Sequence, residues 1–168
     1  MVEEYRGPIL YVIHSPTFQE HQTPAEKDHN KKVLDAMQKA ASMKIPIVIN
    51  PPAGYTPQLD KQIKLFKKKP KIIFLTNKHS NGYLSHNFRQ QLEKEGIYPT
   101  TITGMGRYRD QCVIDNLEHA RQAFPDAKIW LVEGTHTLAY KLNRAYLRRR
   151  MATAKIKKSR KLNPKHFV

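Results

Sequence analysis

Residues 101–123, TITGMGRYRDQCVIDNLEHARQA, carry the pattern that decides the fold of this 168-residue chain. The TIT segment predicts a buried strand, and the glycine-containing segment GMGRYRD predicts a turn. The rest predicts a helix that buries Val113, Leu117 and Ala120 on one face. A strand, a turn and an amphipathic helix in succession form the repeating unit of a parallel α/β sheet.

Short apolar runs alternate with helical patterns along the rest of the chain. Strands are predicted at residues 9–13, 45–49, 71–76, 99–103 and 128–132, with a short sixth strand at 154–156. Such alternation is typical of an α/β, doubly wound, six-stranded and mostly parallel sheet in the order 3-2-1-4-5-6, with helices on both faces. We assign residues 1–156 to this single domain and residues 157–168 to a basic C-terminal tail.

The composition restricts the class of protein. One cysteine in the whole chain excludes an intramolecular disulfide and the usual structural zinc sites, and it favours a reducing, cytoplasmic location. The N-terminus has two glutamates and a short apolar run, so it resembles neither a signal peptide nor a transit peptide. No apolar run is long enough to predict a transmembrane helix.

The net charge of +16 comes from two segments. Residues 61–71 hold six lysines and no acid, and residues 141–168 hold eleven basic residues and no acid, whereas the remainder is close to neutral. Segments of this kind attract polyanions such as nucleic acid, and the expected binding has little sequence preference. A solvated basic surface that aids solubility is the alternative.

Cys112 lies at the predicted start of its helix. A helix N-terminus offers unpaired backbone N–H groups and the positive end of the helix dipole, and both favour the nucleophilic thiolate. The alternative is that Cys112 is a small apolar core residue.

Polar residues follow the predicted strands, at the edge where parallel sheets bind ligands. His14 ends the first strand, Asn50 the second and Lys78 follows the third, while Cys112 follows the fourth. Because strands one and four are neighbours in the predicted order, His14 and Cys112 are expected to share a crevice. The first strand-to-helix turn, HSPTFQE, lacks the glycine-rich dinucleotide fingerprint, so neither NAD nor FAD is indicated, and no other cofactor motif is present.

These segments resemble the isochorismatase-like cysteine hydrolases, which include nicotinamidases and carbamoylases, over nearly the whole chain. The segment ILYVIHSPTF is similar to the family's first strand, which ends in a pattern like LLVIDMQNDF. The segment FLTNKHSNGYLSHNFRQQL corresponds to the family's third strand, lysine and following helix. The segment TGMGRYRDQCV ends in D-x-C-V, as the family signature TG-x-x-T-D-x-C-V does, but it has two more residues between TG and this ending. The segment LVEGT matches the family's fifth-strand pattern loosely.

The resemblance implies a hydrolase of amide-like small molecules, of a divergent kind. Family members use an aspartate, a lysine and a cysteine; Cys112 matches the nucleophile, Lys78 matches the lysine, and the aspartate position falls on His14. Histidine is a base for cysteine in other enzymes, but the same replacement fits a structural residue or a site that has lost the reaction. The resemblance also implies a homo-oligomer, and the histidine of the family's metal-binding members is missing, so no metal is expected.

Two function classes therefore remain, beside chemistry that needs no thiol, which the resemblance also implies because some family members lack the cysteine. The first is a hydrolase of an amide-like C–N bond that works through a Cys112 thioester. The second is a catalytically degenerate binding module whose basic segments bind a polyanion or a protein partner. The missing acid after the first strand is the feature that separates them.

Overall fold

The computed structural model describes residues 3–16, 22–51, 58–76, 87–107, 109–132 and 144–159, with the side chains of residues 58, 109 and 110 left out. Within these ranges the elements follow one another as β1 (Tyr5–Ile13), α1 (Pro24–Ser42), β2 (Ile47–Asn50), α2 (Gln58–Lys64), β3 (Ile72–Phe74), α3 (Phe88–Lys94), β4 (Ile97–Gly106), a π-helical turn (Arg109–Val113), α4 (Ile114–Ala123), β5 (Lys128–Val132), α5 (Arg144–Thr153) and β6 (Ile156–Ser159).

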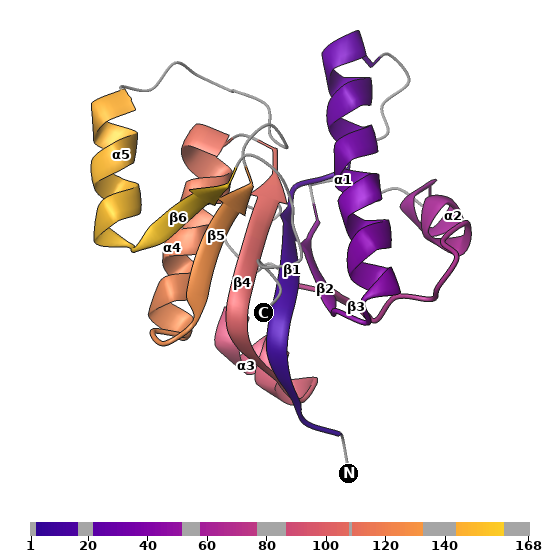
Figure 1. Cartoon of the computed structure of the whole chain (residues 1–168), viewed down its shortest axis with the longest axis horizontal. Coiled ribbons are helices and arrows are strands. Elements are labelled where there is room, and N and C mark those ends of the chain that lie inside the picture. Colours follow the sequence, from indigo (N-terminus) through magenta and orange to yellow (C-terminus); the bar gives the residue numbers. More distant parts are fainter. Residues whose placement is uncertain are drawn as a thin grey trace.

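The six strands form one sheet in the order β3-β2-β1-β4-β5-β6 (Figure 1). Every neighbouring pair in this sheet is parallel. The predicted fold class and strand order are therefore confirmed. The carboxyl ends of the strands consequently lie at one edge of the sheet, where His14 follows β1 and Arg107 follows β4.

Apolar side chains on the two faces of the sheet form two cores. Leu10 and Val12 of β1 pack with Val33 and Met37 of α1 on one face. The alternate β1 residues, such as Tyr11, pack with α3, α4 and α5 on the other face. This alternation follows from the two-residue period of a strand, and it gives each face of the central strand a covering layer of helices.

The first helix, α1, begins with a capping box at Thr23. The Thr23 hydroxyl accepts a hydrogen bond from the Glu26 backbone N–H at 3.2 Å, and the Glu26 carboxylate accepts one from the Thr23 N–H at 2.9 Å. This reciprocal pair satisfies two backbone donors that the helix itself leaves open. In the part of the chain that the structure describes, no helix combines the length and the apolar character needed to cross a bilayer.

The fourth strand is longer than predicted, because it continues through the glycines that were expected to form a turn. A Cβ at Gly104 would lie 2.5 Å from Leu117 Cδ2, and a Cβ at Gly106 would lie 2.0 Å from the Ile13 carbonyl oxygen. The two glycines thus let α4 and β1 approach the strand closely. At the other end of the sheet, β6 covers Ile156–Ser159, so residues 157–159 of the expected tail belong to a strand.

The last helix is attached to the fourth through a shared ion pair. The Arg150 guanidinium of α5 donates hydrogen bonds to Asp115 and Glu118 of α4. Leu147 and Met151 on the same helix are buried against the α4 side of the sheet. The described part of α5 covers Arg144–Thr153.

Candidate functional site

The carboxyl ends of the three central strands are joined by backbone hydrogen bonds. The His14 N–H, just past β1, donates to the carbonyl of Asn50 at the end of β2 at 2.8 Å. The Arg107 N–H, just past β4, donates to the carbonyl of Ile13 at 2.9 Å. These bonds place His14, Asn50 and Arg107 side by side at the edge of the sheet where ligands bind in such folds.

His14 is held in an unusual backbone conformation. Its φ is +52°, in the left-handed region that L-residues other than glycine rarely adopt. The residue is 7% exposed although its side chain is polar. Residues of this kind concentrate at functional sites, because the surrounding structure must stabilise the strained backbone.

Cys112 lies in the π-helical turn Arg109–Val113, which continues directly into α4, so it is in the first helical turn as predicted, although that turn is π-helical rather than α-helical. Its side chain is 7% exposed and belongs to the apolar core that α4 shares with the sheet. Burial raises the pKa of the Cys112 thiol, and the Asp115 carboxylate raises it further, while a backbone hydrogen bond lowers it. The net direction is opposite to the one expected from a helix N-terminus, because desolvation outweighs the backbone hydrogen bond.

A buried amide connects Cys112 to the central strands. The side-chain oxygen of Asn116 accepts hydrogen bonds from the Tyr11 hydroxyl and from the Asn50 side-chain amide, both at 2.9 Å. The Asn116 amide in turn donates to the Cys112 carbonyl at 2.8 Å. The start of α4 is therefore fixed to β1 and β2 through one side chain, which is 1% exposed.

Sequence reasoning did not select Asn116, although a signal was present. The residue lies four positions after Cys112 and four before Ala120, on the face of the helix that carries the buried apolar residues. A polar side chain on that face has to find buried partners. Its position on the buried face of the helix was thus sufficient to identify Asn116 as a buried polar residue.

A second polar pair lies beside His14 and was also missed. The Ser15 hydroxyl and Nε2 of His29 are 2.7 Å apart, and both residues are buried, at 0% and 5% exposure. On the same side of the sheet, Arg107 forms an ion pair with Glu26 at the start of α1. His29 lies four residues before Val33 on the buried face of that helix, which is the signal that marks it.

Mild acid is expected to weaken the folded state through His29. Burial, with a further contribution from the Arg107 charge, lowers the pKa of its ring from 6.5 to about 4. Between pH 6.5 and about 4, the His29 ring binds a proton in the unfolded chain but not in the folded chain. The free energy of unfolding therefore keeps its full value above pH 6.5 and decreases as the pH falls toward about 4. The expected loss is on the order of 3 kcal/mol.

Urea unfolding of the wild type and of His29→Gln at about pH 7 and about pH 4.5 measures this loss. The variant should lose much less stability than the wild type over the same interval. Hydrogen bonds from Thr23 lower the pKa of Glu26, which titrates in both proteins, so the difference between them isolates His29. Equal losses in the two proteins would show that the ring does not carry the effect.

Some of the predicted residues lie outside the part of the chain that the structure describes. Lys78 lies outside the described residues, so its position relative to His14 and Cys112 stays a prediction. Residues 133–143 and 160–168, which contain part of the second basic segment, lie outside them as well.

Among the described side chains, no three potential metal ligands of the His, Cys, Asp or Glu type lie together.

Comparison with known proteins gives matches at the level of structure. No family model matches the sequence, and no curated protein is significantly similar to it. The pyrazinamidase of Pyrococcus horikoshii, solved in complex with zinc, superposes with a TM-score of 0.60 at 12% identity, over 91% of this chain and 98% of that one. The N-carbamoylsarcosine amidase of Thermoplasma acidophilum superposes with a TM-score of 0.59 at 15% identity, over 92% and 96% of the two chains.

The chain has the isochorismatase-like fold. The strand order and the coverage of both chains carry this assignment, which the resemblance of the sequence predicted. The MAR1 ribonuclease of Caenorhabditis elegans is also similar, with a TM-score of 0.56 at 11% identity over 90% of this chain and 75% of that one. Because one fold supports different reactions, the isochorismatase-like fold by itself does not decide the chemistry.

Proposed function

We propose that the chain is a hydrolase that cleaves an amide-like C–N bond of a small molecule, with Cys112 as the nucleophile. The observation that carries the proposal is the placement of His14 and the Cys112 turn after adjacent parallel strands, β1 and β4. This is the position where the resemblance places the catalytic group. The amidases with the same fold support a reaction of this class.

The raised pKa of the Cys112 thiol makes a base necessary in this mechanism. His14 accepts the thiol proton, and the thiolate attacks the substrate carbonyl. The amine then leaves with the proton that His14 accepted, and a water molecule that gives its proton to His14 hydrolyses the thioester; His14 returns this proton to the departing sulfur, which releases the acid and restores the thiol. Lys78 supplies the positive charge that favours the thiolate over the opposing effects of burial and Asp115. Asn116 keeps the Cys112 backbone in place during these steps.

A panel of primary amides and N-carbamoyl compounds, including nicotinamide, pyrazinamide and N-carbamoylsarcosine, tests the proposal through the release of ammonia. Cys112→Ala should lower kcat/KM on any accepted substrate by at least about a thousandfold, because no thioester forms. Cys112→Ser, which keeps nearly the same volume, controls for packing. Retained activity in Cys112→Ala would exclude the thiol as nucleophile, and no turnover of any compound by the wild type would count against the hydrolase.

The role of His14 has a separate test. If His14 is the base, kcat/KM should fall as the pH drops through its pKa, because the imidazolium cannot accept a proton. His14→Asp restores the residue implied by the resemblance and should move this fall to lower pH. If kcat/KM falls at the same pH in His14→Asp as in the wild type, the base is another residue.

A second candidate function is the binding of a polyanion through residues 61–71 and 141–168. The described basic side chains of these segments are mostly exposed, among them Lys61, Lys64, Lys67, Arg144, Arg148 and Arg149. The similarity to a ribonuclease supports this candidate. Gel shifts with single-stranded RNA should show an affinity that falls by orders of magnitude between about 50 and 200 mM salt. If the double variant Arg148→Glu and Arg149→Glu binds RNA as tightly as the wild type, α5 is not part of the RNA-binding surface.

A further inference from the structure

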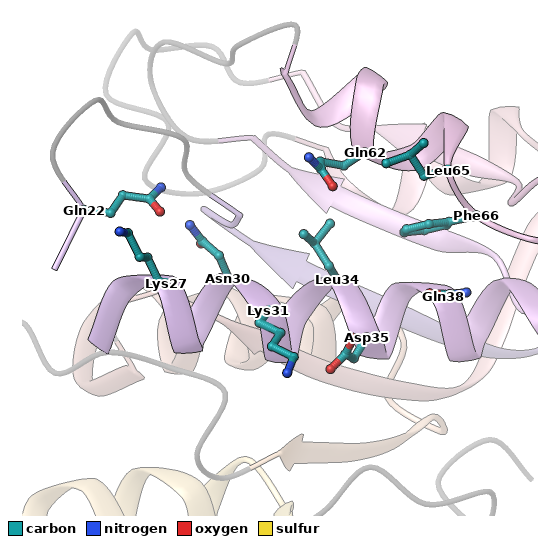
Figure 2. A pocket seen from close by; sticks show the side chains of 10 residues that line it. All are labelled: Gln22, Lys27, Asn30, Lys31, Leu34, Asp35, Gln38, Gln62, Leu65 and Phe66. Carbon is teal, nitrogen blue, oxygen red and sulfur yellow. The ribbon is translucent and has the colours of Figure 1, made fainter. Parts of the chain in front are cut away.

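An open groove of about 370 Å³ lies between α1 and α2, in the helical layer opposite α4 (Figure 2). Leu34 points from α1 toward Gln62 and Phe66, which come from α2 and the turn after it (Figure 2). The proposed hydrolase reaction uses none of these residues. The groove therefore requires an explanation of its own.

Leu34 and Phe66 form an apolar part of the groove floor among polar lining residues, and one rim of the groove is apolar and exposed. Leu34 and Phe66 are half-buried and pack against the core beneath α1. Leu65 on the rim is 75% exposed, the most exposed large hydrophobic residue in the described ranges. An apolar rim beside an apolar floor offers a place for an inserted side chain, because burial there removes further apolar surface from water.

The surroundings of the groove are basic. Lys27 and Lys31 line it from α1, where Asp35 is the single acid among the lining residues. Lys61, Lys64 and residues 67–69 add exposed ammonium groups along α2 and the turn that follows. A ligand with carboxylates around an apolar anchor would match this arrangement in both charge and shape.

We propose that the α1–α2 groove binds an acidic amphipathic helix of a partner protein. One apolar side chain of the partner, a leucine or a phenylalanine, enters between Leu34 and Leu65, and its flanking glutamates and aspartates face the lysines of α1 and α2. This is the helix-in-groove mode of peptide recognition. An exposed leucine, together with a floor whose one aromatic side chain, Phe66, is half-buried, favours a polypeptide over single-stranded nucleic acid, which relies on exposed aromatic planes for its bases. The inference is independent of the hydrolase reaction.

A fluorescent peptide of about 16 residues, with Leu and Phe on one face and Glu on the other, serves as the probe for the intact chain. Fluorescence anisotropy should give saturable binding at moderate salt. Leu65→Ser should weaken it about tenfold, because an exposed leucine loses its contact with the peptide while the fold is left intact. Lys64→Glu should weaken it by a similar factor.

Matched variants on α5 control for general effects of charge and apolar exposure. Tyr146→Ser removes another exposed apolar side chain, 53% exposed, and Arg148→Glu reverses another exposed charge. Both should leave the affinity for the peptide within about twofold, since neither residue borders the groove. Equal weakening by the two sets, or equal binding of a peptide whose Leu and Phe are replaced by Ser, would overturn the proposal. If RNA displaces the peptide equally well from the wild type and from Leu65→Ser, the surface binds nucleic acid instead.

Discussion

Gly106→Ala is expected to destabilise the protein by about 4 kcal/mol, among the largest costs that one methyl group can have. Gly106 ends β4 with a φ of +149°, which an L-residue adopts only with strain. The added Cβ would lie 2.0 Å from the Ile13 carbonyl oxygen, which is backbone. The Ile13 carbonyl also accepts the hydrogen bond from Arg107, so relief of the clash would move the ends of β1 and β4 apart.

Thermal unfolding followed by circular dichroism measures this cost, and a decrease in Tm of roughly 8–16 °C is expected for a chain of this size. Gly7→Ala in β1 is the matched control. A Cβ there would meet the Tyr5 hydroxyl at 2.9 Å, which belongs to a side chain rather than to backbone, so relief of this clash costs at most the hydrogen bond from that hydroxyl to the Pro8 carbonyl. A Tm for Gly106→Ala within about 2 °C of the control would show that the two strands adapt easily at this edge.

The sequence was sufficient to predict the sheet, because the signals that define it are local. Each central strand is an apolar run bounded by polar or turn residues, and the helix that follows β1 begins at a capping box of four residues. The strand boundaries were less predictable. Glycines usually indicate a turn, but Gly104 and Gly106 remain in β4, because their missing side chains make room for Leu117 and for the backbone of β1.

The candidate site was predictable in position but not in its electrostatics. The order of the strands was enough to place His14 and the Cys112 turn at one edge of the sheet. The burial of Cys112 depends on how α4 packs against residues far away in sequence, and this burial reverses the expected direction of the thiol pKa. A long-range packing effect of this kind leaves no periodic pattern in the sequence.

This reversal changes what the proposed reaction would require of the site. A thiolate that formed spontaneously would need nothing more than a positioned substrate, whereas a thiol held in its protonated form needs a base and a nearby positive charge. Asp115 contributes to the raised pKa, yet the same carboxylate is needed to bind Arg150 of α5. If Cys112 is the nucleophile as proposed, the attachment of α5 and the formation of the thiolate therefore make opposing demands on Asp115.

Asn116→Leu is expected to cost about 3 kcal/mol and to increase the reactivity of Cys112. The substitution removes the acceptor of the Tyr11 and Asn50 side chains and the donor to the Cys112 carbonyl, all in a buried network. Leucine is similar in volume, so the cost comes from lost hydrogen bonds rather than from a cavity. Because the π-helical turn then loses its attachment to β1 and β2, the thiol should become accessible more often.

Urea unfolding measures the cost of Asn116→Leu, and the rate of alkylation by iodoacetamide under native conditions measures the exposure of the thiol. Gln122→Leu is the matched control, since it makes the same kind of change at an exposed position of α4 and should stay within about 0.5 kcal/mol of the wild type. Tyr11→Phe, which removes one hydroxyl from the network, should cost about 1 kcal/mol. If Asn116→Leu alkylates no faster than Gln122→Leu, then Asn116 stabilises the fold without fixing the position of Cys112.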